Sequence, residues 1–167
     1  MNKNYLVDRL LHWAGAFLVI IMVLNMNAQI HTTDYRLKGQ ILHRQEAVSN
    51  HALLAMIVLT LVLSRLAFNY LFPNSKVRKP IENPTHARFI ASVRIGLVLT
   101  LFGLVTTGFL MAANIDIPFN LFGIHFSEGG EKNLSSYSDI QSLHHTFMTT
   151  LWWLIGIHVI GALYANK

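Results

Sequence analysis

Residues 143–165 read LHHTFMTTLWWLIGIHVIGALYA, and this stretch decides the fold. It contains no Asp, Glu, Lys or Arg, and a helix needs about 20 mostly apolar residues to cross a bilayer. His144 and His158 share one face of such a helix, because their spacing of 14 residues is about 40° short of four full turns at about 100° per residue. They lie about 21 Å apart along the axis at about 1.5 Å rise per residue. The stretch therefore predicts a membrane span with histidines at two depths.

Three other stretches have the same apolar character. The chain has 167 residues, 53% of them hydrophobic and 13% charged, whereas a soluble domain usually carries about 25% charged residues. Its mean hydropathy of +0.42 is also high. A soluble enzyme and a disordered chain are therefore disfavoured. We expect an all-α integral membrane four-helix bundle, formed as a single domain over residues 1–167, with spans at about 10–28, 52–72, 90–115 and 143–165.

The basic residues predict the orientation of these spans. Lys and Arg concentrate on the side that holds the N-terminus, the second loop and the C-terminus, whereas acidic residues concentrate in the first and third loops. The positive-inside rule then places both termini in the cytoplasm. The formal net charge of +5 indicates contact with anionic lipid headgroups, and no module typical of nucleic-acid binding is present. The basic side carries Lys3, Arg9, Arg65, Lys76, Arg78, Lys79, Arg88, Arg94 and Lys167.

Histidine carries the remaining chemistry. The chain has no cysteine, which excludes disulfides, thiolate metal sites and covalently attached haem. With the predicted topology, His12 and His158 lie near the cytoplasmic surface, and His51 and His144 lie near the outer surface. Four histidines thus form two level pairs. Ionisable residues in a membrane are costly and usually face the bundle interior.

Two level histidine pairs suit haem iron. A pair on facing helices can hold a haem from both sides, and two axial imidazoles leave no open position, which favours electron transfer over oxygen binding. Zinc is the rival metal, but it usually takes three or four protein ligands in one cluster. We therefore expect His12 with His158, and His51 with His144, as axial ligands of two haem b groups.

Four further residues are candidates for haem binding. Gly15 follows His12 by three residues, and Gly161 follows His158 by three. Both could admit a flat ring or serve ordinary small-residue helix packing. We call His12 with His158 the inner pair and His51 with His144 the outer pair. Arg65 follows His51 by 14 residues, which places it at the depth of the inner pair as a partner for a haem propionate. Arg94 could do the same or extend to the headgroups. No role is assigned to His31, His43, His86, His125 and His145.

The motifs together resemble the bacterial cytochrome b561 family. They are Arg9-Leu-Leu-His12-Trp13, Asn50-His51 followed by Arg65, and Leu143-His144-His145-Thr146 followed by Gly156-Ile-His158. The resemblance covers nearly the whole chain. It implies a dihaem b protein of the bacterial inner membrane, with ligands at the same four histidines. The family includes a branch that oxidises superoxide and reduces ubiquinone, and b-type subunits of hydrogenases and other dehydrogenases.

Several functions therefore compete. The first is transmembrane electron transfer between a periplasmic donor such as superoxide and membrane ubiquinone, with Arg36, Lys38, Arg44 and Lys132 as candidates for steering the anion. The second is a cytochrome b subunit that wires a periplasmic or cytoplasmic redox partner to the quinone pool. A histidine-based proton relay or transporter, or a purely structural adaptor, would need no haem. The relay is disfavoured because the four apolar stretches contain no Asp or Glu.

Overall fold

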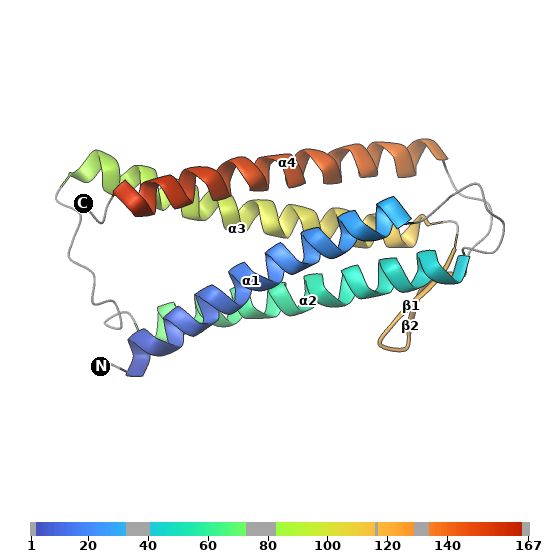
Figure 1. Cartoon of the computed structure of the whole chain (residues 1–167), viewed down its shortest axis with the longest axis horizontal. Coiled ribbons are helices and arrows are strands. Elements are labelled where there is room, and N and C mark those ends of the chain that lie inside the picture. The colour runs from blue at the N-terminus through green and yellow to red at the C-terminus, as the bar shows by residue number, and fades with distance from the viewer. Residues whose placement is uncertain (1–2, 33–40, 73–82, 116, 129–133, 165–167) are drawn as a thin grey trace.

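The computed structural model of the chain is an elongated helical bundle (Figure 1). Residues 3–32, 41–72, 83–115, 117–128 and 134–164 are described. Within these ranges the helices are α1 (Lys3–Thr32), α2 (Ile41–Leu71), α3 (Pro84–Ala113) and α4 (Leu134–Tyr164). Two short strands, β1 (Pro118–Leu121) and β2 (Ile124–Glu128), follow α3 and precede α4 in the sequence.

Each of the four helices is long and apolar enough to cross a membrane, which confirms the predicted number of spans. The qualifying segments are Lys3–Met26, Leu42–Leu71, Pro84–Ala113 and Ser135–Tyr164. Each helix starts several residues before the apolar stretch that predicted it, because helical hydrogen bonding continues through the flanking polar residues. Large apolar side chains such as Trp153 and Ile160 point outward. Lipid is the solvent that such a surface requires.

The helices pack as two pairs. α1 packs mainly on α2, and α3 packs mainly on α4, while the pairs meet chiefly through α2 and α3 (Figure 1). Gly103 lets α3 and α4 approach closely, because a Cβ atom there would lie only 2.7–2.9 Å from the ring of Phe147 on α4. Asn83 caps the start of α3 by accepting hydrogen bonds from the backbone N–H groups of Thr85 and His86.

The hairpin formed by β1 and β2 was not expected from the sequence. The strands pair antiparallel and join through Phe122 and Gly123, both of which have positive φ. The hairpin packs against α2 and α3 near one end of the bundle. There Ile117 and Phe119 pack with Ala112 and Ile115 in the buried core. The all-α prediction is therefore correct for the membrane-spanning part and incomplete at this end.

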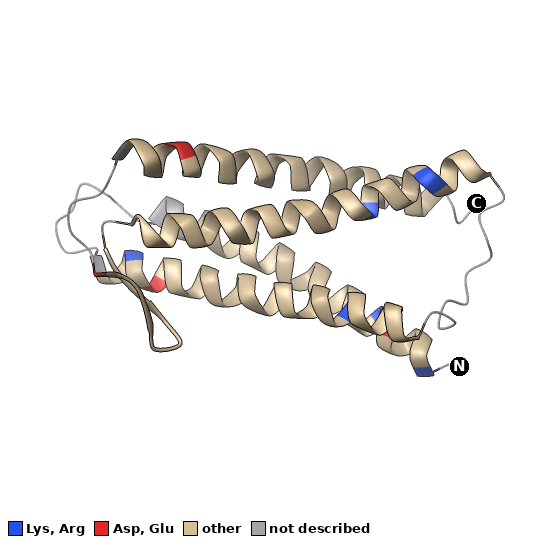
Figure 2. Ribbon diagram, turned by 180° about the vertical axis from the view of Figure 1, so that it is seen from behind, with Lys and Arg blue, Asp and Glu red and all other residues tan. Residues whose placement is uncertain are grey.

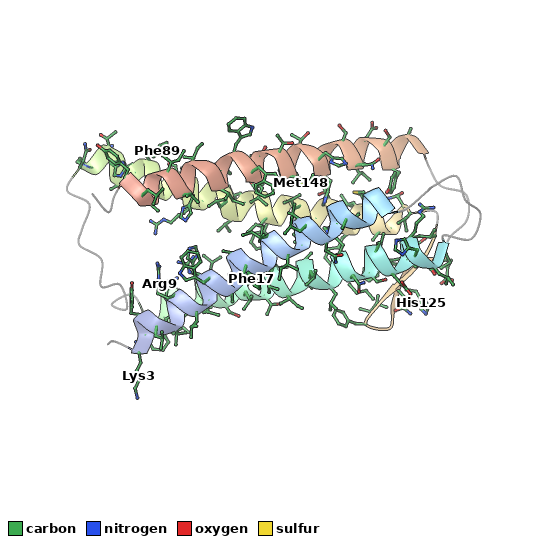
Figure 3. The ribbon with its side chains drawn as sticks, in the orientation of Figure 1. Lys3, Arg9, Phe17, Phe89, His125 and Met148 are labelled. Carbon is green, nitrogen blue, oxygen red and sulfur yellow. The ribbon has the colours of Figure 1, made fainter. Side chains whose placement is uncertain are left out.

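The two ends of the bundle differ in charge. We call the end where α1 starts and α4 finishes the terminal end, and the opposite end, which carries β1 and β2, the hairpin end (Figure 1). Figure 2 shows most of the described Lys and Arg residues toward the terminal end. Lys3 and Arg9 mark that end in Figure 3, and His125 marks the hairpin end. The predicted cytoplasmic location of the terminal end stays a prediction.

Candidate functional site

The structure brings the four histidines together in the two pairs that spacing and topology predict. His12 on α1 lies beside His158 on α4, with ring centroids 6.0 Å apart and ring planes at 75°. His51 on α2 lies beside His144 on α4, with centroids 6.4 Å apart and planes at 71°. Each pair therefore joins one helix of the α1–α2 pair to α4.

These separations suit one iron ion between each pair of rings. An imidazole nitrogen binds a first-row metal at about 2.0–2.1 Å and lies about 1.1 Å from its ring centroid, so two imidazoles on opposite sides of one metal have centroids roughly 6 Å apart. Within the described ranges, no group of three or more His, Cys, Asp or Glu residues forms a metal site. Each of the two pairs offers two imidazoles, a donor set that suits haem better than zinc. The ligand role of the four histidines stays a prediction.

Space beside the rings also suits a flat group. A Cβ atom added at Gly15 or Gly161 would meet no other residue of the described structure within 4 Å. Both glycines lie one turn from a histidine of the inner pair, on the face that carries it. The open surroundings argue against tight helix packing at these glycines and are compatible with room for a ring, a role that stays a prediction.

The outer pair is held from α3. The Nδ1 atom of His144 lies 2.8 Å from the hydroxyl oxygen of Thr107, which is 3% exposed. The same hydroxyl lies 2.8 Å from the Gly103 carbonyl oxygen, to which it donates. His51 contributes a buried Nδ1 atom without a hydrogen-bond partner in the structure. Such an orphaned atom is rare in folded proteins and indicates a bound group or water.

The inner pair has a charged neighbour. Arg65 on α2 donates from Nε to Asp8 Oδ1 at 2.8 Å, and its Nη1 atom lies 3.1 Å from His12 Nδ1. Asp8 is only 7% exposed. It also accepts from Arg9 Nη2 at 2.9 Å and from Asn69 Nδ2 at 3.1 Å. Because a guanidinium only donates, His12 Nδ1 must accept, and the proton of the neutral ring then sits on Nε2.

The inner pair therefore needs a rearrangement before His12 can bind a metal through Nε2. A ligand nitrogen must carry its lone pair toward the metal. Binding through Nε2 of His12 therefore requires Arg65 to leave Nδ1, a movement that would also free its guanidinium for a propionate. Arg65 thus lies at the depth expected from the sequence, but its guanidinium group is already hydrogen-bonded to Asp8 and His12.

The remaining candidates lie outside the two pairs. Arg94 is exposed on α3 near the terminal end, so both its expected roles stay predictions. His145, to which the sequence assigned no role, is exposed next to His144. The ring of His86 meets the Tyr164 ring edge to face, with centroids 5.6 Å apart and ring planes at 66°. Arg36, Lys38, Lys132 and the side chain of His31 lie outside the described residues.

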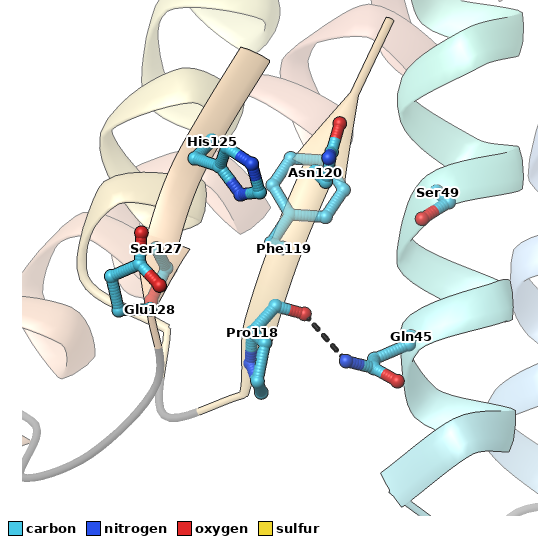
Figure 4. Close-up of a pocket in the computed structure, with 8 residues that line it drawn as sticks. All are labelled: Gln45, Ser49, Pro118, Phe119, Asn120, His125, Ser127 and Glu128. Atoms are coloured by element: carbon cyan, nitrogen blue, oxygen red, sulfur yellow. Dashed lines mark hydrogen bonds between the residues drawn. The ribbon is translucent and has the colours of Figure 1, made fainter. Parts of the chain in front are cut away.

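A polar pocket of about 320 Å³ opens at the hairpin end, between α2 and the strands (Figure 4). Gln45 of α2 donates from Nε2 to the Pro118 carbonyl oxygen at 2.8 Å and so ties the hairpin to the helix. Ser49, His125 and Glu128 also line the pocket. Ser49 precedes His51 by two residues on α2, so the pocket and the outer pair are at the same end of the bundle.

Three functional candidates were missed at the sequence level. Asp8 lies just before the first apolar stretch and four residues, or one helical turn, before His12. Asn69 stands in the same relation after Arg65. A search for polar residues one turn from each histidine or arginine would have found both. Thr107 has no such signal, because only the packing of α3 on α4 brings it to His144.

Comparison with known protein families gives one result for the whole chain. The family model described as prokaryotic cytochrome b561 matches residues 5–167. The match agrees with the resemblance drawn from the histidine motifs. No individually curated protein gives a significant match to the sequence.

Proposed function

The chain belongs to the prokaryotic cytochrome b561 family, whose members are transmembrane haem b electron-transfer proteins, and from this premise we propose that it carries two haems. The observation that carries the proposal is the pair of histidine pairs, with ring centroids 6.0 and 6.4 Å apart. Haem supplies reversible one-electron chemistry. Two such groups at different depths would form a path for electrons across the bilayer.

In this proposal each residue of the site has a defined task. His12 and His158 would hold the haem at the terminal end, and His51 and His144 would hold the haem at the hairpin end. Gly15 and Gly161 leave room for the inner ring. Arg65 would neutralise a propionate of the haem held by His12 and His158, and Arg94 is the second candidate for that task.

We further propose that the terminal end faces the cytoplasm of a bacterium and that the protein passes electrons from a periplasmic donor to ubiquinone in the inner membrane. Superoxide is the donor that the family resemblance suggests. The pocket at the hairpin end does not favour an anion, because the carboxylate-bearing Glu128 lines it. Steering of superoxide would therefore depend on Arg44 and on the basic residues outside the described part.

The alternative is a cytochrome b subunit that connects a redox partner to the quinone pool. The hairpin supports it, since Phe122 and Ile124 at its turn are 71% and 60% exposed. An exposed apolar tip rimmed by polar residues is typical of a contact site. Co-purification of a stoichiometric redox partner would favour this role, whereas oxidation of superoxide coupled to reduction of a short-chain ubiquinone by the isolated protein would favour the first.

A proton relay is the weaker alternative. The sequence disfavours it because the four apolar stretches contain no Asp or Glu, but the helices extend beyond those stretches. The span Lys3–Met26 does contain an acid, Asp8. The oxygens of Asp8 are, however, occupied by donors from Arg9, Arg65 and Asn69. A carboxylate held by two guanidinium groups is a structural ion pair and is poorly placed to exchange protons with His12.

The test is the visible spectrum and haem content of the purified protein. We expect sharp α and Soret bands on reduction and two haems per chain. His51→Ala and His158→Ala should each remove about one haem, because each pair loses one of its two ligands. His145→Ala, next to the outer pair but exposed, is the matched control and should keep both. A protein that contains no haem after expression with adequate haem supply would contradict the proposal.

A further inference from the structure

We infer that the hydroxyl of Thr107 is a positioning group that fixes His144 in the tautomer able to bind iron through Nε2. The inference rests on the proposed haem ligation at the outer pair and assigns a residue of α3, which bears none of the four proposed ligands. Thr107 would not touch the metal. It would act through the imidazole of His144.

The Thr107 hydroxyl has a single hydrogen to donate. Thr107 Oγ1 lies 2.8 Å from the carbonyl oxygen of Gly103 and 3.1 Å from that of Leu104. Carbonyl oxygens only accept, so the hydroxyl hydrogen points into its own helix, as is common for threonine in helices. A lone pair of Oγ1 therefore faces His144 Nδ1 at 2.8 Å. The hydrogen between these two atoms must belong to Nδ1.

A proton on Nδ1 leaves Nε2 of His144 free to bind a metal. In a neutral imidazole with its proton on Nδ1, Nε2 holds a free lone pair. The reverse arrangement, with the hydroxyl donating to Nδ1, would leave Oγ1 facing two carbonyl oxygens at 2.8 and 3.1 Å with no hydrogen between them. That arrangement is repulsive, so the tautomer of His144 is set by the backbone of α3.

Burial of Thr107 strengthens its control over the His144 tautomer. Thr107 is 3% exposed, so water does not compete for its hydroxyl. The His144 ring lies against the next residue of α3, since a Cβ atom at Gly108 would be in ordinary contact with its Cε1 atom at 3.9 Å. The inner pair lacks this arrangement, because the donor at His12 Nδ1 is Arg65. Metal-bound histidines are commonly oriented by such a partner on the second nitrogen, which also raises their basicity as ligands.

The experiment compares Thr107→Ala with Thr107→Ser, which differ at this position only by the hydroxyl, and adds Thr107→Val as the variant of closest shape. Haem is titrated into the haem-free protein, and the midpoint potentials are measured, with His51→Ala and His158→Ala identifying the signal of each haem. Thr100→Val is the matched control. Thr100 is 5% exposed on α3, and within the described residues it has no hydrogen bond to a histidine.

We expect Thr107→Ala and Thr107→Val to weaken binding of the outer haem alone by about 10–100-fold. The midpoint potential of that haem should become more positive, because a less basic imidazole stabilises ferric iron less. Thr107→Ser and Thr100→Val should behave like the unaltered chain. Equal affinities and potentials in the Ala and Ser variants would overturn the inference while leaving a dihaem protein intact.

A second measurement does not need haem. ¹⁵N chemical shifts of histidine-labelled haem-free protein distinguish the two tautomers, and His144→Gln identifies the signal. The Nδ1–H form is expected in the unaltered chain and in Thr107→Ser, and a tautomeric mixture in Thr107→Ala. An Nε2–H form in the unaltered chain would overturn the inference. If this measurement supports it and the protein takes up no haem, the failure belongs to the proposed function.

Discussion

Asp8 shows how much one buried side chain can organise at the end of a membrane bundle. It joins α1 to α2 through Arg65 and Asn69, and it also receives Arg9 from its own helix. An unpaired guanidinium in a membrane is unfavourable, and the Asp8 carboxylate stabilises the charge of Arg65. The same contact holds the Nη1 atom of Arg65 against His12.

Replacing Asp8 by Ala should therefore destabilise the protein. The change removes hydrogen bonds to charged donors, which are each worth about 1.5–3 kcal/mol, and the partial exposure of Arg65 returns some of that loss through water. We expect a net loss of about 2–3 kcal/mol in the free energy of unfolding, measured in detergent by denaturant titration of the haem-loaded protein.

Asp139→Ala is the control for this change. Asp139 is an exposed acid near the start of α4, and surface substitutions usually alter stability by less than about 0.5 kcal/mol. A similar small change for Asp8→Ala would show that the ion pairs between α1 and α2 contribute nothing net, as is known for many exposed pairs.

The sequence predicted the histidine partners because the arrangement needs only helix periodicity and the alternating direction of successive spans. It could not predict what holds the rings. Thr107 meets His144 across an interface between two helices, and a one-residue rotation of either helix would separate them. Arg65 was predicted at the right depth, but its partner Asp8 was excluded by the limits set for the first apolar stretch.

At the scale of elements, Gly103 is the described glycine with the least room for a side chain. Gly103→Ala places a Cβ atom 2.7–2.9 Å from the Phe147 ring, so α3 and α4 must separate or the ring must move. Overpacking of this kind typically costs about 1–3 kcal/mol. We expect a lower thermal midpoint and preferential loss of the outer haem, because Phe147 lies one turn from His144. Absorbance at the Soret band during heating measures both.

Two further variants separate a clash from a general effect of alanine. Gly156→Ala changes a glycine of α4 whose added Cβ atom would meet no other described residue within 4 Å. It should be neutral or stabilise by up to about 1 kcal/mol, because alanine favours a helix. Phe147→Leu in the Gly103→Ala background should recover part of the loss. If Gly103→Ala is as stable as Gly156→Ala, the close contact is not required.

The helices were predictable from composition, whereas the hairpin was not. A two-residue hairpin turn with positive φ usually carries Asn-Gly or Asp-Gly, and here Phe122 occupies the first position at φ 55°. A bulky residue in this region is uncommon and gives no signal in the sequence. The hairpin also forms by packing Phe119 and Ile117 on the end of α3, a contact that only the assembled bundle provides.

At the scale of the whole molecule, the topology of the helices and the distribution of charge together predict which end of the bundle faces the periplasm. The four spans return the chain to the end where it begins (Figure 1), so both histidine pairs have fixed places relative to the termini. The positive-inside rule then predicts that the hairpin end faces the periplasm. The assignment matters because it decides which haem the donor reaches first.

The absence of cysteine from the chain makes the orientation directly measurable. Ile124→Cys, at the exposed turn of the hairpin, should react with a membrane-impermeant maleimide in intact bacterial cells. Thr85→Cys, exposed at the start of α3, should react only after the cells are broken, and the unaltered chain gives the background. The reverse pattern would put His51 and His144 at the cytoplasmic face. A periplasmic donor would then meet the Arg65 side of the bundle, and the roles proposed for the two pairs would exchange.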